Sequence, residues 1–188
     1  MEVRALLDVL HVAERLKDEL RHCDTSKGRR ESVAEHSWRI ALMALFMQDE
    51  FPELDMDKVI RMCLIHDLGE CFTGDIPTFL KSKEDEKKED EALAAWVKSL
   101  PEPYCTELAD LYAEMNALQT GEARLYKTLD KLEAVIQHNE ADIRTWEPHE
   151  YELNLTYAND IVAGTPYLEQ LREAIRDDTK QKIAEAQK

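Results

Sequence analysis

Apolar residues recur along most of the chain at the spacing of amphipathic helices. In residues 2–20 the leucines and alanines fall on one helical face, so this segment is predicted to form a helix. The pattern fades at "RHCDTSKGRR", residues 21–30, which contain one glycine and several basic side chains. We interpret this stretch as a polar loop.

Two further helices are predicted after this loop. Ser32 and Glu35 have the spacing of a capping box, so a helix should begin there. One face of that helix carries His36, Ile40, Met43 and Met47. The next segment, "LDMDKVIRMCLIHDLGE", is apolar over 59–65 except at Arg61, which indicates the most buried helix. Asp55 or Asp57 is expected to cap it, and Gly69 is expected to end it.

The rest of the chain also follows the helical period. Residues 71–81 contain Gly74 and Pro77 and are expected to form an ordered loop, and the charged run 82–91 a solvated helix start. Further helices are predicted at about 84–99, 102–118, 120–143, 148–163 and 165–186, and no strand pattern is found. The prediction is therefore one all-α domain, a helical bundle that spans residues 1–188.

The charge of the chain restricts its partners. The net charge of −16 disfavours nucleic acid and anionic membranes, although a small phosphorylated substrate remains possible. The four cysteines have no CxxC spacing and indicate neither a disulfide framework nor a zinc knuckle. No signal peptide or membrane-length apolar run is found, so we expect a cytoplasmic protein.

Four polar residues lie beside buried helix faces. His66 and Asp67 are expected in the last turn of the apolar third helix, His36 lies on the face described above, and Asp130 flanks the leucines of "EARLYKTLDKLEAVIQ". Each alone is ordinary, because core histidines and helix-edge aspartates usually have structural roles. Together they form a mixed nitrogen and oxygen set from three helices, which suits one divalent Mn, Co, Fe, Ni or Zn ion.

The segments "VAEHSWR", "LIHDLGECFTGDIP" and "LDKLEA" resemble the HD-domain metal-dependent phosphohydrolases, and most closely their 5'-deoxynucleotidase branch. The ordered set is His36, His66, Asp67 and Asp130, with 30 residues from the first to the second and 63 from Asp67 to the last. The resemblance implies an all-α HD fold with a metal site in its core. It also implies removal of phosphate from deoxyribonucleoside 5'-monophosphates, commonly by a homodimer.

The resemblance also assigns roles to individual positions. His36, His66, Asp67 and Asp130 would be the metal ligands, and Glu70 and Asp75 the catalytic carboxylates. The residues expected to bind substrate are Arg21, His22, His36, Asp67, Asp75, Ile76, Pro77, Thr78 and Asp130. Arg21 would orient the phosphate. His22 stands where bacterial members have a tryptophan against the sugar, so the resemblance leaves the preferred sugar and base open.

The expected reaction is metal-assisted hydrolysis. The metal would polarise a phosphoryl oxygen, and Glu70 or Asp75 would take the water proton or protonate the leaving 5'-oxygen. No histidine lies between His66 and His138, which argues against a dinuclear phosphodiesterase. Two alternatives remain: hydrolysis of another small phosphate ester or a nucleoside triphosphate, and a non-enzymatic helical adaptor with a structural metal.

Overall fold

The computed structural model describes residues 1–77 and 80–187. Helices dominate this part of the chain, as predicted, and a short hairpin joins the first two. The elements in chain order are α1 (Val3–Ala13), the 3₁₀ turn η1 (Glu14–Lys17), β1 (Leu20–Asp24), β2 (Arg30–Ser32), α2 (Val33–Phe46), η2 (Gln48–Glu50), α3 (Met56–Ile65), α4 (Glu70–Thr73), α5 (Lys83–Ser99), α6 (Tyr104–Ala117), α7 (Gly121–Glu140), η3 (Ile143–Thr145), α8 (Glu150–Thr156), α9 (Asn159–Val162) and α10 (Pro166–Ala186).

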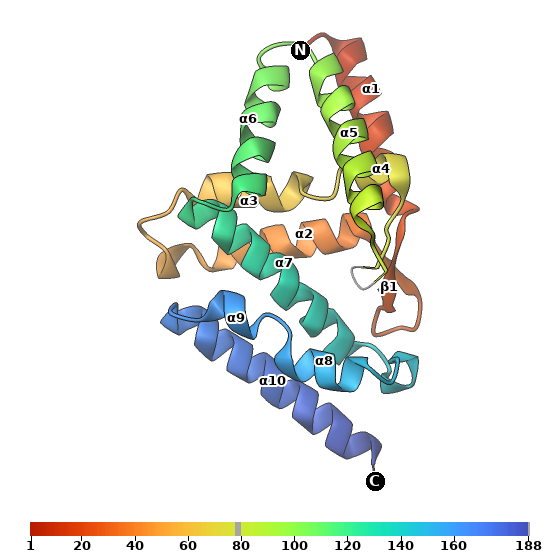
Figure 1. Cartoon of the computed structure of the whole chain (residues 1–188), viewed down its shortest axis with the longest axis vertical. Helices are drawn as coiled ribbons and strands as arrows, with labels where there is room; N and C mark the ends of the chain where they lie inside the picture. Colours follow the sequence, from red (N-terminus) through yellow and green to blue (C-terminus); the bar gives the residue numbers. More distant parts are fainter. Residues whose placement is uncertain (78–79, 188) are drawn as a thin grey trace.

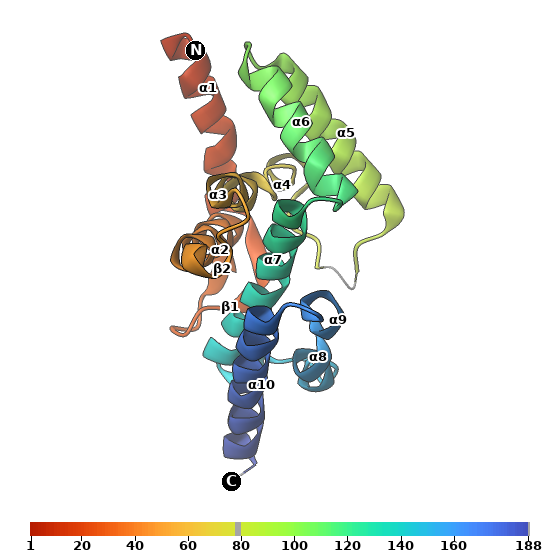
Figure 2. The same cartoon turned by 90° about the vertical axis from the view of Figure 1, so that its left-hand side faces the viewer.

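Three helices, α2, α3 and α7, pack together at the centre of the molecule (Figure 1). α1 and the α5–α6 pair extend from one end, and α8, α9 and α10 lie at the other (Figure 2). Fully buried apolar side chains fill the centre, including Ile40 of α2, Met62 of α3 and Leu129 of α7. The all-α fold is therefore confirmed, and the core lies where the three central helices meet.

Capping interactions set where α2 and α3 begin. Ser32 Oγ accepts a hydrogen bond from the Glu35 backbone N–H, and the Glu35 carboxylate accepts one from the Ser32 N–H, which confirms the capping box. Asp55 caps α3 by accepting from the Lys58 N–H at 3.0 Å. Each such cap typically contributes about 1 kcal/mol. The cap at Ser32 places His36 in the first turns of α2.

Two helix predictions were wrong at their ends. The first predicted helix stops as α1 at Ala13, and the chain continues through η1 into β1. α3 ends at Ile65 rather than at Gly69, so His66 and Asp67 lie in the turn that follows it. Gly69 has ordinary helical φ and instead allows close packing, because a Cβ there would lie 2.7 Å from Glu89 Cγ.

The interpretation of residues 21–30 as a loop without strands was also wrong. β1 and β2 pair antiparallel, with Leu20 opposite Ser32 and Asp24 opposite Arg30, and the register is irregular between them. Gly28 turns the chain with a φ of +78°. These short strands carry mostly polar residues, so no alternating apolar pattern was present to reveal them. The hairpin is held against α7, where Gln137 Nε2 donates to the Asp24 carbonyl at 2.7 Å.

The helix predicted at 148–163 is divided into α8 and α9. Ala158 adopts a left-handed conformation with a φ of +65°, which interrupts the helical hydrogen bonds. Arg172 of α10 is buried and satisfies the freed carbonyls: Nε donates to Tyr157 O at 2.8 Å, and Nη2 donates to Asn154 O at 2.9 Å. This guanidinium therefore joins α10 to the end of α8. Within the described residues, no helix combines the length and apolarity needed to span a membrane.

Removal of the Arg172 guanidinium should destabilise the fold. Arg172→Ala leaves the buried Asn154 carbonyl and the partly buried Tyr157 carbonyl without these donors, and we expect a loss of about 2–4 kcal/mol in the free energy of unfolding. Urea denaturation would measure it. Lys180→Ala, on an exposed position of the same helix, is the control and should change stability little. Equal midpoints for the two variants would contradict this role of Arg172.

Candidate metal and active site

Three central segments bring His36, His66, Asp67 and Asp130 together. His36 Nε2 lies 3.2 Å from Asp130 Oδ1 and 3.9 Å from Asp67 Oδ2. His66 Nε2 lies 2.9 Å from Asp67 Oδ2 and 3.8 Å from Asp130 Oδ1. The potential ligand atoms of His36, His66 and Asp67 all lie within 4.8 Å of one another. Two nitrogens and two oxygens therefore converge on one region between α2, α3 and α7.

The hydrogen bonds at Nδ1 of each histidine direct Nε2 towards this region. His66 Nδ1 donates to the Cys63 carbonyl at 2.9 Å, and His36 Nδ1 donates to the Glu133 carboxylate. His66 Nε2 is buried and makes no hydrogen bond to another described residue, because its close approach to Asp67 Oδ2 lacks hydrogen-bond geometry. A divalent cation would satisfy this nitrogen, so the donor set fits a metal.

The charges around the site keep both aspartates ionised. Burial acts to raise the pKa of Asp130, but Lys127, whose Nζ donates to Oδ2 at 2.7 Å, and the two histidines hold that pKa well below its usual range. Burial likewise opposes ionisation of Asp67, whereas His66 and His36 lower its pKa. Two half-buried carboxylates thus present negative charge where a cation would bind.

His36 carries a proton when no cation is present. Burial and the neighbouring Arg21 act to lower the pKa of His36, but its hydrogen bonds to Asp130 and Glu133 raise it to about 9. The Nε2 proton then takes the place of a cation beside Asp130. Binding of a metal at Nε2 must displace that proton, so metal binding and proton release are coupled at this histidine.

Glu70 and Asp75 lie beside the four converging residues. Glu70 begins α4 and is only 6% exposed, and burial, followed by the charges of Asp67, Asp75 and Glu89, raises its pKa to about 10. Its Oε2 is buried without a hydrogen bond to another described residue. Burial also raises the pKa of Asp75, which is close enough to Asp67 and His36 to respond to their charges. Two carboxyl groups with raised pKa values therefore lie beside the four converging residues.

The charged run 82–91 contributes one residue to this region. Glu89 packs against Gly69, and its Oε2 lies 2.6 Å from Lys81 Nζ. The interpretation of the run as a solvated helix start was therefore incomplete. Helical spacing on α5 could have indicated an inward-facing side chain, but a run of alternating charges does not reveal which carboxylate turns inward.

A cavity of about 230 Å³ opens next to this cluster, and Arg21 and Asp75 form part of its wall. Arg21 interacts with Asp67 through charge, which places this part of the wall near the four converging residues. The remaining wall is mixed, with His22, Cys23, Pro77, Ala134, Val135, His138, Glu150, Leu153, Asn154 and Tyr157. Its size and its combination of apolar and polar groups suit a small organic ligand.

Only some of the residues expected to bind substrate line this cavity. Arg21, His22, Asp75 and Pro77 line the cavity, whereas Ile76 is half-buried and is not among the described residues that line it. His36, Asp67 and Asp130 belong to the cluster beside it. Thr78 lies outside the described residues.

Three polar residues of the cavity wall, His138, Glu150 and Asn154, were not assigned to a site by the sequence analysis. His22 Nε2 lies 3.1 Å from Glu150 Oε1, and His138 Nε2 lies 3.7 Å from the same oxygen. Asn154 Nδ2 donates to His138 Nδ1 at 3.2 Å. Glu150 and Asn154 come from α8, far from the recognised motifs, so no local pattern marked them.

Comparisons with known proteins agree with this geometry. A solved structure described as a predicted metal-dependent phosphohydrolase from Magnetospirillum magnetotacticum is 30% identical, with a TM-score of 0.79, and the match covers 96% of this chain and 93% of that one. The human protein named 5'-deoxynucleotidase HDDC2 is 35% identical over 114 residues, which are 60% of this chain and 55% of that protein. Its Dictyostelium discoideum namesake is 33% identical over 130 residues, 65% of this chain and 67% of that protein.

The match to the human relative spans little more than half of that protein's length. The family model described as "HD domain", in contrast, matches residues 13–172, which include all four converging residues and most of the described helices. The chain therefore belongs to the HD domain family.

Proposed function

We propose that this protein is a metal-dependent phosphohydrolase that releases phosphate from (deoxy)ribonucleoside 5'-monophosphates. The observation that carries the proposal is the convergence of two imidazoles and two carboxylates beside a cavity that contains Arg21 and Asp75. The names of the human and Dictyostelium relatives, both 5'-deoxynucleotidases, support the choice of substrate class.

His36, His66, Asp67 and Asp130 would hold one divalent cation. The set accepts Mn, Co, Fe, Ni or Zn, and we leave the choice among them open. When bound, such a cation supplies Lewis-acid polarisation of a phosphoryl oxygen. The two Nδ1 hydrogen bonds support this assignment, because they leave Nε2 of each histidine as the ligating atom.

The remaining chemistry belongs to the side chains around the cavity. Arg21 would bind the non-bridging phosphate oxygens through its planar guanidinium. Glu70 or Asp75 would accept the proton of the attacking water or donate a proton to the leaving 5'-oxygen. The burial of Glu70 supports such a role, since a buried carboxyl group can hold or give a proton where bulk water is excluded.

The nucleoside would occupy the rest of the cavity. Pro77 and the apolar wall offer contact area, and His22, backed by Glu150, offers a polar surface. Ile76, which follows Asp75 in the chain, and Thr78 are further proposed substrate contacts. A polar imidazole can accept a sugar hydroxyl, so we include ribonucleotides among the proposed substrates.

We further propose a homodimer of one-domain subunits in the cytoplasm. The exposed leucines of α1, among them Leu6 and Leu10, support contact with a second copy, and the four free thiols suit a reducing compartment. Sedimentation equilibrium that returned the mass of one chain would contradict the dimer.

Loss of one ligand should remove the cation and the activity together. His66→Ala and Asp67→Ala each delete a side chain of the converging set, so we expect them to lose the roughly one metal ion per chain found in wild type. Elemental analysis and phosphate release would be measured on the same samples. His11→Ala, an exposed histidine of α1, should retain both. Full activity after verified removal of metal would contradict the proposal.

Variants of the two proposed catalytic carboxylates should lose turnover but retain the metal. Glu70→Gln and Asp75→Asn preserve side-chain volume and are not assigned as ligands, so the cation should remain. Their turnover should fall by ~10²-fold or more, the usual contribution of a positioned acid or base. Glu86→Gln, exposed on α5, is the control. Turnover at the wild-type rate in either variant would exclude that residue from proton transfer.

The substrate class is tested with matched nucleotides. We expect phosphate release from 5'-monophosphates and not from 3'-monophosphates, with deoxy and ribo forms differing by about 10²-fold or less in kcat/KM, the limit for an apolar sugar wall. Arg21→Ala should impair all 5'-monophosphates alike, because a phosphate contact does not distinguish sugar or base. Failure of the metal-loaded protein to hydrolyse any 5'-monophosphate would overturn the proposed function.

A further inference from the structure

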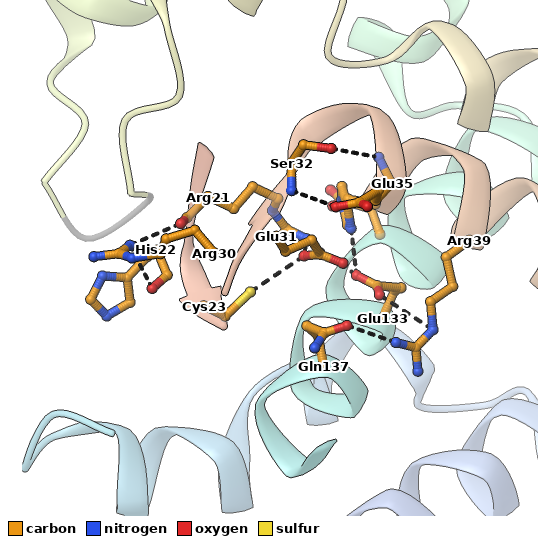
Figure 3. Close-up of polar contacts among 12 residues, drawn as sticks. Arg21, His22, Cys23, Arg30, Glu31, Ser32, Glu35, Arg39, Glu133 and Gln137 are labelled. Atoms are coloured by element: carbon orange, nitrogen blue, oxygen red, sulfur yellow. Dashed lines mark hydrogen bonds and ion pairs between the residues drawn. The ribbon is translucent and has the colours of Figure 1, made fainter. Parts of the chain in front are cut away.

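Two buried carboxylates that no ligand assignment uses lie behind His36. Glu31 is 2% exposed and belongs to β2, and Glu133 is fully buried on α7. Both contact the same atom of Arg21: Nη1 donates to Glu31 Oε2 at 2.9 Å and to Glu133 Oε2 at 3.2 Å (Figure 3). The hairpin and α7 are thereby joined through one guanidinium nitrogen.

Glu133 also fixes the orientation of His36. Its Oε2 accepts the hydrogen bond from His36 Nδ1, and a carboxylate can only accept. His36 therefore keeps a proton at Nδ1 with or without a cation, and its Nε2 faces Asp67 and Asp130. The same carboxylate oxygen thus contacts both a proposed metal ligand and the proposed phosphate-binding arginine.

Glu31 makes its hydrogen bonds with residues of β1, including Arg21. Besides Arg21, its Oε2 accepts from the Cys23 thiol at 3.3 Å. Glu31, His36 and Glu133 have ligand atoms within 4.8 Å of one another and resemble a second cation site. Arg21 pairs with both carboxylates and Arg39 Nε lies 3.6 Å from Glu133 Oε1, so two guanidiniums face these two carboxylates and the group is explained without another ion.

We propose that Glu133 is a positioning residue that couples the metal ligand His36 to Arg21, and that Glu31 positions Arg21. Both roles rest on the proposed function. Because Nη1 of Arg21 is held by the two carboxylates, the guanidinium is fixed at the cavity wall, and its other nitrogens make no hydrogen bond to another described residue. Those nitrogens are the ones that would contact phosphate.

The two carboxylates differ in what they position, which gives a direct test. Glu133→Gln should weaken Co²⁺ affinity, measured by chelator competition, by about 10- to 100-fold, the usual effect of losing a group that orients a ligand. It should also raise KM for a 5'-monophosphate. Glu31→Gln should raise KM and leave Co²⁺ affinity unchanged. Glu107→Gln, on an exposed position of α6, is the control and should change neither.

The tautomer of His36 provides a readout that a purely structural role would not change. In Zn²⁺-loaded wild-type protein, ¹H–¹⁵N spectra should show the His36 proton at Nδ1, and exchange of this proton should be faster in Glu133→Gln. Should Glu133→Gln fail to fold, Glu133→Asp, which keeps the charge but shortens its reach, replaces it in both measurements, with the same directions of change.

Wild-type Co²⁺ affinity and unchanged proton exchange in a folded Glu133 variant would overturn the coupling role. Equal losses of Co²⁺ affinity in the Glu31 and Glu133 variants would overturn the division of roles, as would an equal loss in Glu107→Gln. Co²⁺ affinity is measured without substrate. A wild-type protein that binds Co²⁺ but hydrolyses no nucleotide would therefore refute the proposed function while leaving the Glu133 test intact.

Discussion

The junction of α2, α3 and α7 depends on compensating the charge of Asp67 and Asp130. Two carboxylates are held ionised there, and removal of such groups from water is costly unless positive charge is close by. Lys127 and the histidines supply part of that charge in the protein alone. A bound cation would supply the rest, so the chemistry of this region and the stability of its packing are linked.

The hairpin β1–β2 connects this junction to the cavity that is proposed to bind substrate. It carries Arg21 and His22 to the cavity wall and Glu31 behind His36, although its strands are short and polar. Its position depends on contacts with α7, through Gln137 and through the bonds that Arg21 makes with Glu133. The same helix α7 carries Asp130 on the adjoining turn, so one element orients both the proposed metal site and the proposed phosphate site.

The sequence was informative where the signal was local. Helical periodicity and the caps at Ser32 and Asp55 predicted the central helices. Polar residues beside buried helix faces, together with the family resemblance, indicated which four residues would converge. The sequence analysis failed for residues whose contacting side chains lie far away in the chain. Glu133 shares the motif "LDKLEA" with Asp130, but only the fold shows that it contacts His36, 97 positions away. Glu150 and Glu89 likewise acquire their surroundings from packing alone.

The central claim is that His36, His66, Asp67 and Asp130 bind one divalent cation. Its most direct test is a crystal of the protein soaked with Mn²⁺ and measured at a wavelength that reveals manganese by anomalous scattering. The account predicts one strong anomalous peak among these four side chains, with ligand distances of about 2.0–2.3 Å. A peak between Glu31 and Glu133 instead, or none among the four residues in Mn²⁺-saturated protein, would contradict it.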